Sequence, residues 1–185
     1  VFGMTPGEST RIAGLQHGGV LIGMILGAIG AARFGTLVGW AAAGCIASAA
    51  ALVSLVLMPA AGSVAGLKIS VFALGFANGI FAVAAIGSMM GLTIRGRAGG
   101  AGMRMGFWGA AQAIAYGLGG MVGAAGSDIA RSALGSPAAG YAAVFSLEAM
   151  LFVVAAILVS TRVRGSAPRG LDPLKKAGRA MAEAA

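Results

Sequence analysis

The chain has 185 residues, of which 58% are hydrophobic and only 10% are charged, and its mean hydropathy is +0.92. Soluble domains carry about 25% charged residues, so this composition excludes an ordinary soluble domain. The 33 glycines follow no Gly-X-Y period, which excludes collagen. Dense glycine within apolar helices is instead typical of membrane bundles, where small residues let helix backbones approach closely.

Five apolar segments are each about 20 residues long, which is enough to cross a bilayer as a helix. They lie near residues 12–32, 37–59, 67–92, 104–126 and 141–163, and Gly-, Pro- or Arg-containing linkers separate them. This pattern predicts an all-α, polytopic transmembrane bundle of about five spanning helices over residues 1–163. A basic tail follows over residues 164–185. Because residue 1 is valine and the number of spans is odd, we expect a further helix on the N-terminal side.

The basic residues are distributed unevenly between the two ends of the predicted helices. When the linkers are assigned to alternate sides of the membrane, ten of the 13 Lys and Arg residues fall on one side. The positive-inside rule makes this side cytoplasmic and places the C-terminal tail there. The anchors predicted on this side are Arg33, Arg95, Arg97 and Arg104. The net charge of +8 is then explained by the membrane surface, and no nucleic-acid partner is needed.

The first segment carries the chain's single histidine, His17, preceded by Gln16. His17 lies about 8 Å inside the predicted span, at 1.5 Å per residue. A neutral imidazole at that depth could ligate a metal, including the magnesium of a chlorin ring, or carry a proton. The alternative is a helix-to-helix hydrogen bond that Gln16 shares. Next to His17, overlapping small-xxx-small spacing predicts close helix packing; it is formed by Gly19, Gly23 and Gly27.

Polar residues in the later segments suggest further ligand contacts or helix packing. Asn78, in the third segment, is expected to make a packing hydrogen bond and is kept as a ligand candidate. The fourth segment combines flat rings, an amide and bare backbone at a spacing of three to four, in Trp108, Gln112, Tyr116, Gly119 and Gly123. Such a stripe suits a planar apolar ligand, and it would equally suit a neighbouring helix.

Glu148 lies seven residues inside the fifth segment, and Tyr141, Phe145 and Phe152 are expected on the same side. Its carboxyl group could carry a proton, bind a ligand or tie two helices together. The sequence has no nucleophile motif, no phosphate-binding loop and no pair of carboxylates on one segment, so we expect a protein that is not an enzyme. A single histidine without a Cys or carboxylate cluster offers too few ligands for a transition metal, so we expect no transition-metal site.

Three strings resemble the PucC/LhaA family, the bacteriochlorophyll-delivery branch of the major facilitator superfamily. They are VFGMTPGESTRIAG, RGRAGGAGMRMGFWGAAQAIAYGLGG and YAAVFSLEAMLF, and the resemblance covers roughly residues 1–163. It implies a fold of twelve helices in two halves, in which the five segments correspond to helices 8–12. The N-terminal half of that fold is absent from this chain, which is then a truncated piece, a split gene product or a remnant.

The resemblance implies an assembly factor for light-harvesting antenna complexes in a bacterial inner membrane, either cytoplasmic or intracytoplasmic. Its expected partners are antenna polypeptides, membrane lipid, the missing half of the bundle, and bacteriochlorophyll as the bound pigment. The pigment- or ligand-binding candidates are His17, Gln16, Asn78, Trp108, Gln112, Tyr116 and Glu148. Two alternatives remain open: a proton-coupled transporter of another small molecule, and a stoichiometric subunit of a photosynthetic complex.

Overall fold

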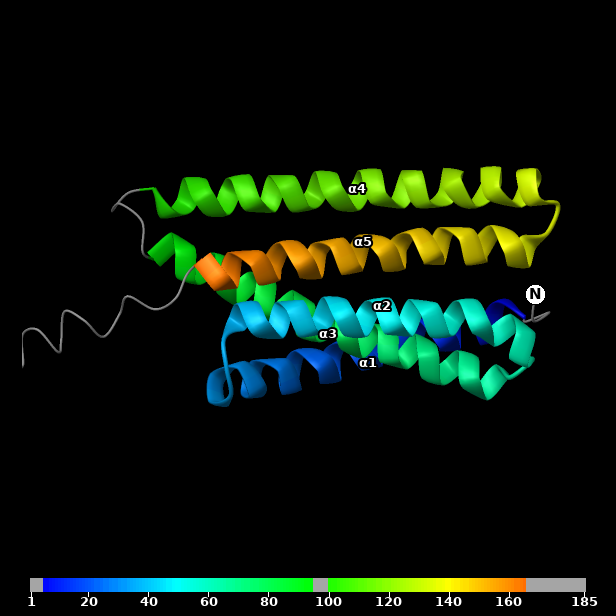
Figure 1. Cartoon of the computed structure of the whole chain (residues 1–185), viewed down its shortest axis with the longest axis horizontal. Helices are drawn as coiled ribbons and strands as arrows, with labels where there is room; N and C mark the ends of the chain where they lie inside the picture. Colours follow the sequence, from blue (N-terminus) through cyan, green and yellow to red (C-terminus); the bar gives the residue numbers. More distant parts are fainter. Residues whose placement is uncertain (1–4, 95–99, 166–185) are drawn as a thin grey trace, which may run out of the picture.

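The structure is a computed structural model that describes residues 5–94 and 100–165. Within these ranges it contains only helices and short connections, which confirms the predicted all-α fold (Figure 1). The five helices are α1 (Pro6–Arg33), α2 (Leu37–Ala61), α3 (Val64–Ile94), α4 (Ala101–Leu134) and α5 (Pro137–Gly165). Two of the predicted anchors, Arg95 and Arg97, and most of the predicted tail, from residue 166 on, lie outside the described residues.

Four of the described helices are long and apolar enough to cross a membrane, so the chain is a membrane protein. These spans are Pro6–Arg33, Leu37–Met58, Val64–Gly91 and Pro137–Thr161. The fifth span expected at residues 104–126 is helical, but α4 is not among these four apolar helices. Its many glycines contribute little hydrophobicity, and Gln112 in the middle lowers the average further.

The helices extend beyond the predicted spans because local capping signals, rather than hydropathy, decide where they end. α1 begins six residues earlier than expected, at a capping box in which the Glu8 carboxylate accepts a hydrogen bond from the Thr5 amide at 2.9 Å. α2 and α4 end at Gly62 and Gly135, whose φ values of 61° and 62° are in the left-handed region. Glycine adopts this conformation without the steric penalty of a Cβ atom.

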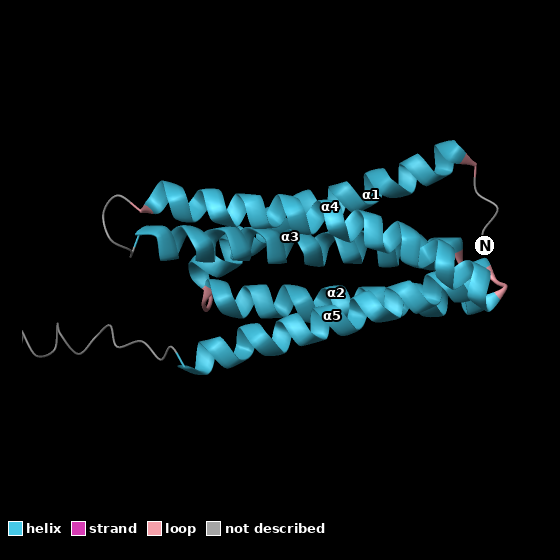
Figure 2. Cartoon of the chain, turned by 90° about the horizontal axis from the view of Figure 1, so that it is seen from above, coloured by secondary structure: helices cyan, strands magenta, loops and turns pink. Residues whose placement is uncertain are grey.

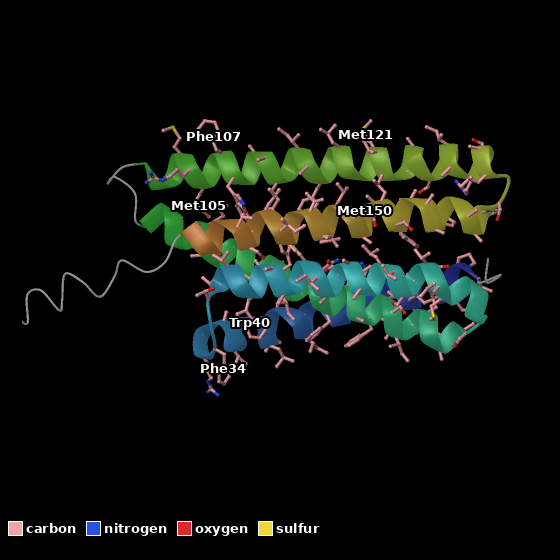
Figure 3. All side chains as sticks on the ribbon, in the orientation of Figure 1. Phe34, Trp40, Met105, Phe107, Met121 and Met150 are labelled. Atoms are coloured by element: carbon pink, nitrogen blue, oxygen red, sulfur yellow. The ribbon has the colours of Figure 1, made fainter. Side chains whose placement is uncertain are left out.

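α3 lies at the centre of the bundle and packs against both α1 and α2. α5 packs against α2, and the two helices run side by side in both views (Figures 1 and 2). α4 packs mainly against α5, so α4 forms the outer edge in Figure 1. Figure 3 shows Phe107 and Met121 on the side of α4 that points away from the bundle, where they are 71% and 70% exposed. One side of α4 therefore has no neighbour in the described part of the chain.

A cluster of buried apolar side chains joins α2, α3 and α5. Ala49, Leu52 and Leu55 of α2 are buried together with Ala149 of α5. Larger, partly buried side chains surround this cluster; they are Leu67, Val71, Leu74, Phe145 and Phe152. Alanine at the centre lets the two helices approach closely, and the surrounding leucines and phenylalanines fill the remaining space.

Candidate functional site

The glycines of α1 lie directly against the backbone of α3. A Cβ atom added to Gly19 would be 2.5 Å from the carbonyl oxygen of Phe72, and one added to Gly23 would clash with the carbonyl group of Phe76. The contact is reciprocal, because a Cβ on Gly75 of α3 would clash with the carbonyl group of Gln16. Gly27 follows on the same side of α1 and is also buried. Only glycine permits this separation between the two helices, and the small-residue spacing favours such packing.

His17 lies on a different side of α1 from these glycines, and its side chain is exposed. Its Nδ1 atom is 2.8 Å from the carbonyl oxygen of Ala13 in the same helix. A carbonyl oxygen can only accept a hydrogen bond, so Nδ1 must carry the proton of the neutral ring. Nε2 then keeps its lone pair. Within the described ranges, the hydrogen bond of His17 is to α1 itself and not to another helix.

The surface around His17 is open. A Cβ atom added to Gly14 or Gly18 would meet nothing within 4 Å. Leu21, one turn further along α1, is apolar and 61% exposed. Gln16, in contrast, is half-buried and presents its backbone to α3. The two neighbouring polar residues therefore face different surroundings, with Gln16 at the helix contact and His17 outside it.

Asn78 makes a packing contact between α2 and α3. Its Oδ1 atom accepts a hydrogen bond from the Ser48 hydroxyl at 2.9 Å, and Ser48 is fully buried. A second bond between the same helices joins the hydroxyls of Ser54 and Ser70 at 2.9 Å. Asn78 is therefore engaged as an interhelix tie, which agrees with the packing role expected for it. The sequence interpretation overlooked the three serines, although hydroxyls within apolar segments are a signal for such bonds.

Breaking the Ser48–Asn78 bond is expected to weaken the α2–α3 contact measurably. Interhelix hydrogen bonds in membranes average about 0.6 kcal/mol and reach about 1.7 kcal/mol in double-mutant cycles. A cycle of Ser48→Ala and Asn78→Ala, followed by unfolding in mixed micelles, should give a coupling energy in that range. As a control, Ser88→Ala should not couple to Asn78→Ala, because the Ser88 hydroxyl donates to Ala84 of its own helix. A coupling energy near zero for Ser48 and Asn78 would contradict the assignment.

The polar stripe predicted on α4 is present as a local group. The Gln112 amide donates to the Tyr116 hydroxyl at 3.4 Å, and Tyr116 is 73% exposed. Trp108 is half-buried one turn before them. A Cβ atom added to Gly119 or Gly123 would meet nothing within 4 Å, so these glycines have no helix against them in the described residues. α1 does not contact α4. The stripe and His17 are consequently two separate places on the protein.

Glu148 is exposed on α5, whereas the next residue, Ala149, enters the core. Phe145 and Phe152 pack against that core, and Phe145 also stacks on Tyr141 with ring centroids 6.3 Å apart. Among the described residues, Glu148 has no hydrogen-bond or ion-pair partner, so the interhelix tie considered for it is not formed here. The described part of the chain also contains no group of three His, Cys, Asp or Glu side chains that could hold a metal ion.

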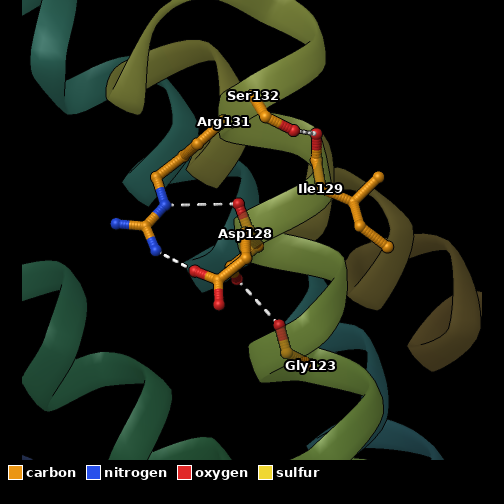
Figure 4. A network of polar contacts seen from close by, with 6 residues as sticks. Gly123, Asp128, Ile129, Arg131 and Ser132 are labelled. Atoms are coloured by element: carbon orange, nitrogen blue, oxygen red, sulfur yellow. Dashed lines mark hydrogen bonds and ion pairs between the residues drawn. The ribbon is translucent and has the colours of Figure 1, made fainter.

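Apart from Glu148, the charged residues of the described ranges lie towards the two ends of the bundle. The end of α1 with Arg33, the start of α4 with Arg104, and the end of α5 all lie at one end (Figure 1). At the other end, the Arg131 guanidinium pairs with Asp128 and donates to the Ser127 carbonyl at 3.3 Å (Figure 4). The same guanidinium lies 5.6 Å from the centre of the Tyr141 ring, which links the end of α4 to the start of α5.

Comparison with known proteins finds a matching family and relatives in Rhodobacter capsulatus. The chain matches the PUCC protein family over residues 1–167. It is 47% identical over 173 residues to the "Bacteriochlorophyll synthase 44.5 kDa chain" of Rhodobacter capsulatus, covering 90% of this chain and 40% of that protein. It is 30% identical over 167 residues to an "Uncharacterized protein in puhA-bchM intergenic region" of the same organism, covering 85% and 34%.

The chain thus spans about 40% or less of the length of these curated relatives. No solved structure matches it. The correspondence with helices 8–12 of the major facilitator fold therefore stays a prediction. Because the family match extends over nearly the whole chain, from the first residue through α5, the chain belongs to the PucC family.

Proposed function

We propose that this protein takes part in the assembly of light-harvesting antenna complexes by binding bacteriochlorophyll, or a related chlorin, within the membrane. Membership of the PucC family and the name of the 47% identical relative support a role connected with this pigment. The role proposed is binding and delivery rather than catalysis. The chain has one histidine and five carboxylates spread along 185 residues, and no catalytic motif groups them.

The orientation of His17 is the observation that carries the proposal. Metal-binding histidines commonly donate one ring N–H to a backbone carbonyl and ligate with the other nitrogen. His17 has this arrangement, because Nδ1 is bonded to Ala13 and Nε2 retains its lone pair. The macrocycle would supply its own magnesium, and Nε2 of His17 would be the nitrogen that holds it. The bare backbone at Gly14 and Gly18 leaves room for a flat ring beside the imidazole.

The other candidates take secondary places in this proposal. Gln112 and Tyr116 on α4 offer an amide and a hydroxyl at a separate apolar surface, where a ring carbonyl could be bound. Glu148 is exposed among apolar side chains of α5, and it is a candidate contact for a partner protein. Asn78 and Gln16 are engaged in helix packing, so we no longer include them among the pigment ligands.

The proposed location is the bacterial inner membrane, with the arginine-rich end of the bundle in the cytoplasm. The partners proposed are antenna polypeptides, lipid and the remaining part of the longer bundle. The open outer side of α4 and the exposed apolar side of α1 supply surfaces for these partners. The collection of Arg33, Arg104 and the end of α5 at one end supports this orientation.

The test is the absorption spectrum of the full-length protein, purified gently from a pigment-producing host, beside His17→Ala and His17→Phe variants. We expect a chlorin band in the unmodified protein and at least a tenfold loss of occupancy in both variants. Because His17 is exposed and bonds only to its own helix, thermal stability should stay unchanged. Gln112→Ala serves as a comparison at the separate α4 surface, and it should retain most of the pigment.

A band of equal strength in the His17 variants would remove His17 as the ligand while keeping pigment binding. The absence of a band from every version would overturn the pigment proposal. Proton-coupled transport would then be the leading alternative, and a flux that depends on both the proton gradient and Glu148 would support it.

A further inference from the structure

Two hollows lie along one side of α2. The first, of about 270 Å³, is lined by Gly35, Thr36, Gly39, Trp40 and Ala43 at the start of the helix. The second, of about 330 Å³, lies between α2 and α5. Its lining consists of Ile46, Val153, Ala156, Ile157, Ser160 and Thr161. Ala43 and Ile46 are three residues apart and therefore neighbours on one helix face, so the hollows follow one another. We call them together the α2–α5 groove.

The length of the α2–α5 groove matches one leaflet of a bilayer. From Thr36 to Ile46 the helix rises by about 15 Å, at 1.5 Å per residue. The hydrocarbon core of a bilayer is about 30 Å thick, so the groove extends from one membrane surface to about the midplane. Its inner walls are apolar, with Ile46 60% exposed and Ile157 57% exposed. Such a surface fits a single hydrocarbon chain that enters from the nearer leaflet.

A positive charge lies beside the outer end of the groove. Arg33 is exposed two residues before Gly35, which lines the first hollow. Among the described residues, the carboxylates of Glu8 and Asp128 belong to the opposite end of the bundle, and Glu148 lies on α5 before the residues that line the groove. A headgroup at the outer end of the groove would lie near the Arg33 guanidinium, which favours an anionic lipid.

We infer that the α2–α5 groove binds one anionic phospholipid, with an acyl chain between Ile46 and Ile157 and the phosphate near Arg33. In the orientation proposed above, this lipid belongs to the cytoplasmic leaflet. The site is separate from His17, which is on α1. Neither site depends on the other, so loss of pigment binding and loss of lipid binding are distinguishable outcomes.

The experiment is native mass spectrometry of the full-length protein in detergent, with phosphatidylglycerol or phosphatidylcholine of the same chain length added. We expect phosphatidylglycerol to bind at least fivefold more tightly. Ile157→Trp should fill the groove and reduce phosphatidylglycerol binding at least fivefold. Leu147→Trp is the matched control, because Leu147 is on the same helix, is also 57% exposed, and lies outside the groove. Arg33→Gln should weaken the binding of phosphatidylglycerol and leave the binding of phosphatidylcholine unchanged.

If Ile157→Trp fails to fold, Ile46→Trp provides a second way to fill the groove, from its opposite wall. Equal binding of the two lipids would overturn the assignment of an anionic ligand. Equal effects of Ile157→Trp and Leu147→Trp would overturn the assignment of the groove. A third outcome would also contradict the inference: a chlorin, rather than phospholipid, stays bound to the protein, and Ile157→Trp displaces it. The groove would then bind the pigment's hydrocarbon tail.

Discussion

Replacing Gly23 with alanine is expected to lower the free energy of unfolding by about 3 kcal/mol, the upper part of the range for overpacking a tight contact. The added Cβ atom would clash with the backbone carbonyl group of Phe76 in α3. A flexible side chain could rotate away, but a helix backbone cannot, so α1 and α3 would have to separate. That separation would also loosen the contact at Gly19, four residues away on the same side. Unfolding of purified protein in mixed micelles measures the effect.

Gly18→Ala is the matched control for this prediction. Gly18 is on the same helix, five residues from Gly23, and a Cβ atom there would meet nothing within 4 Å. Alanine is a better helix former than glycine by as much as about 1 kcal/mol, so this variant should be as stable as the original protein or slightly more stable. If Gly18→Ala and Gly23→Ala behaved alike, the α1–α3 contact would not be as close as the structure places it.

Replacing Trp40 with alanine is expected to destabilise the turn between α1 and α2 by about 2–3 kcal/mol. Truncating a buried tryptophan to alanine lowers the free energy of unfolding by about 3–5 kcal/mol, and the expected value is smaller here because Trp40 is half-buried. Its ring covers Gly30 of α1, where an added Cβ atom would clash with the six-membered ring. Its indole N–H donates to the carbonyl oxygen of Phe34 at 2.6 Å. One side chain thus holds the end of α1, the connecting residues and the start of α2 together.

Trp40→Phe separates the two contributions of Trp40. Phenylalanine keeps an aromatic ring but lacks the N–H donor, so it should cost only about 1 kcal/mol for the lost hydrogen bond. Phe34→Ala should have little effect on stability, because the Phe34 ring is 70% exposed and the bond uses its backbone carbonyl. Thermal unfolding of the three variants, measured side by side, checks the order. If Trp40→Phe and Trp40→Ala lowered the stability equally, the whole effect would be due to the hydrogen bond and none to the packing of the ring.

The sequence predicted the helices well because the bilayer leaves few alternatives. An apolar run of about 20 residues must satisfy its backbone hydrogen bonds internally, and a helix does so. The helix ends were predicted less well, because hydropathy does not detect the capping box at Thr5 or the left-handed glycine at Gly135. The third segment was expected over residues 67–92, whereas α3 spans Val64–Ile94. At its start the Ser63 hydroxyl oxygen accepts a hydrogen bond from the Gly66 amide at 3.0 Å, which hydropathy also does not detect.

The direction of His17 could have been derived from helical geometry. Successive residues are about 100° apart around a helix, so His17 and Gly19 differ by about 200°. The glycines face α3, and His17 accordingly lies away from that contact rather than beside it. The spacing of the glycines could not predict which helix packs against them, because it is a property of α1 alone. Gly119 and Gly123 carry a similar signal, yet the described residues place no helix against them.

The Arg131–Asp128 pair at the turn between α4 and α5 has a consequence for biosynthesis. In the proposed orientation, this turn must pass through the membrane during insertion, and a lone charge within the hydrocarbon core costs several kcal/mol. Opposite charges three residues apart on one helix can cross as a neutral pair. The contact between Arg131 and Tyr141 spans only ten residues of chain, so it can form as soon as both have been synthesised. α4 and α5 can therefore enter the bilayer together as a preformed helical hairpin. α5 of this hairpin then packs against α2.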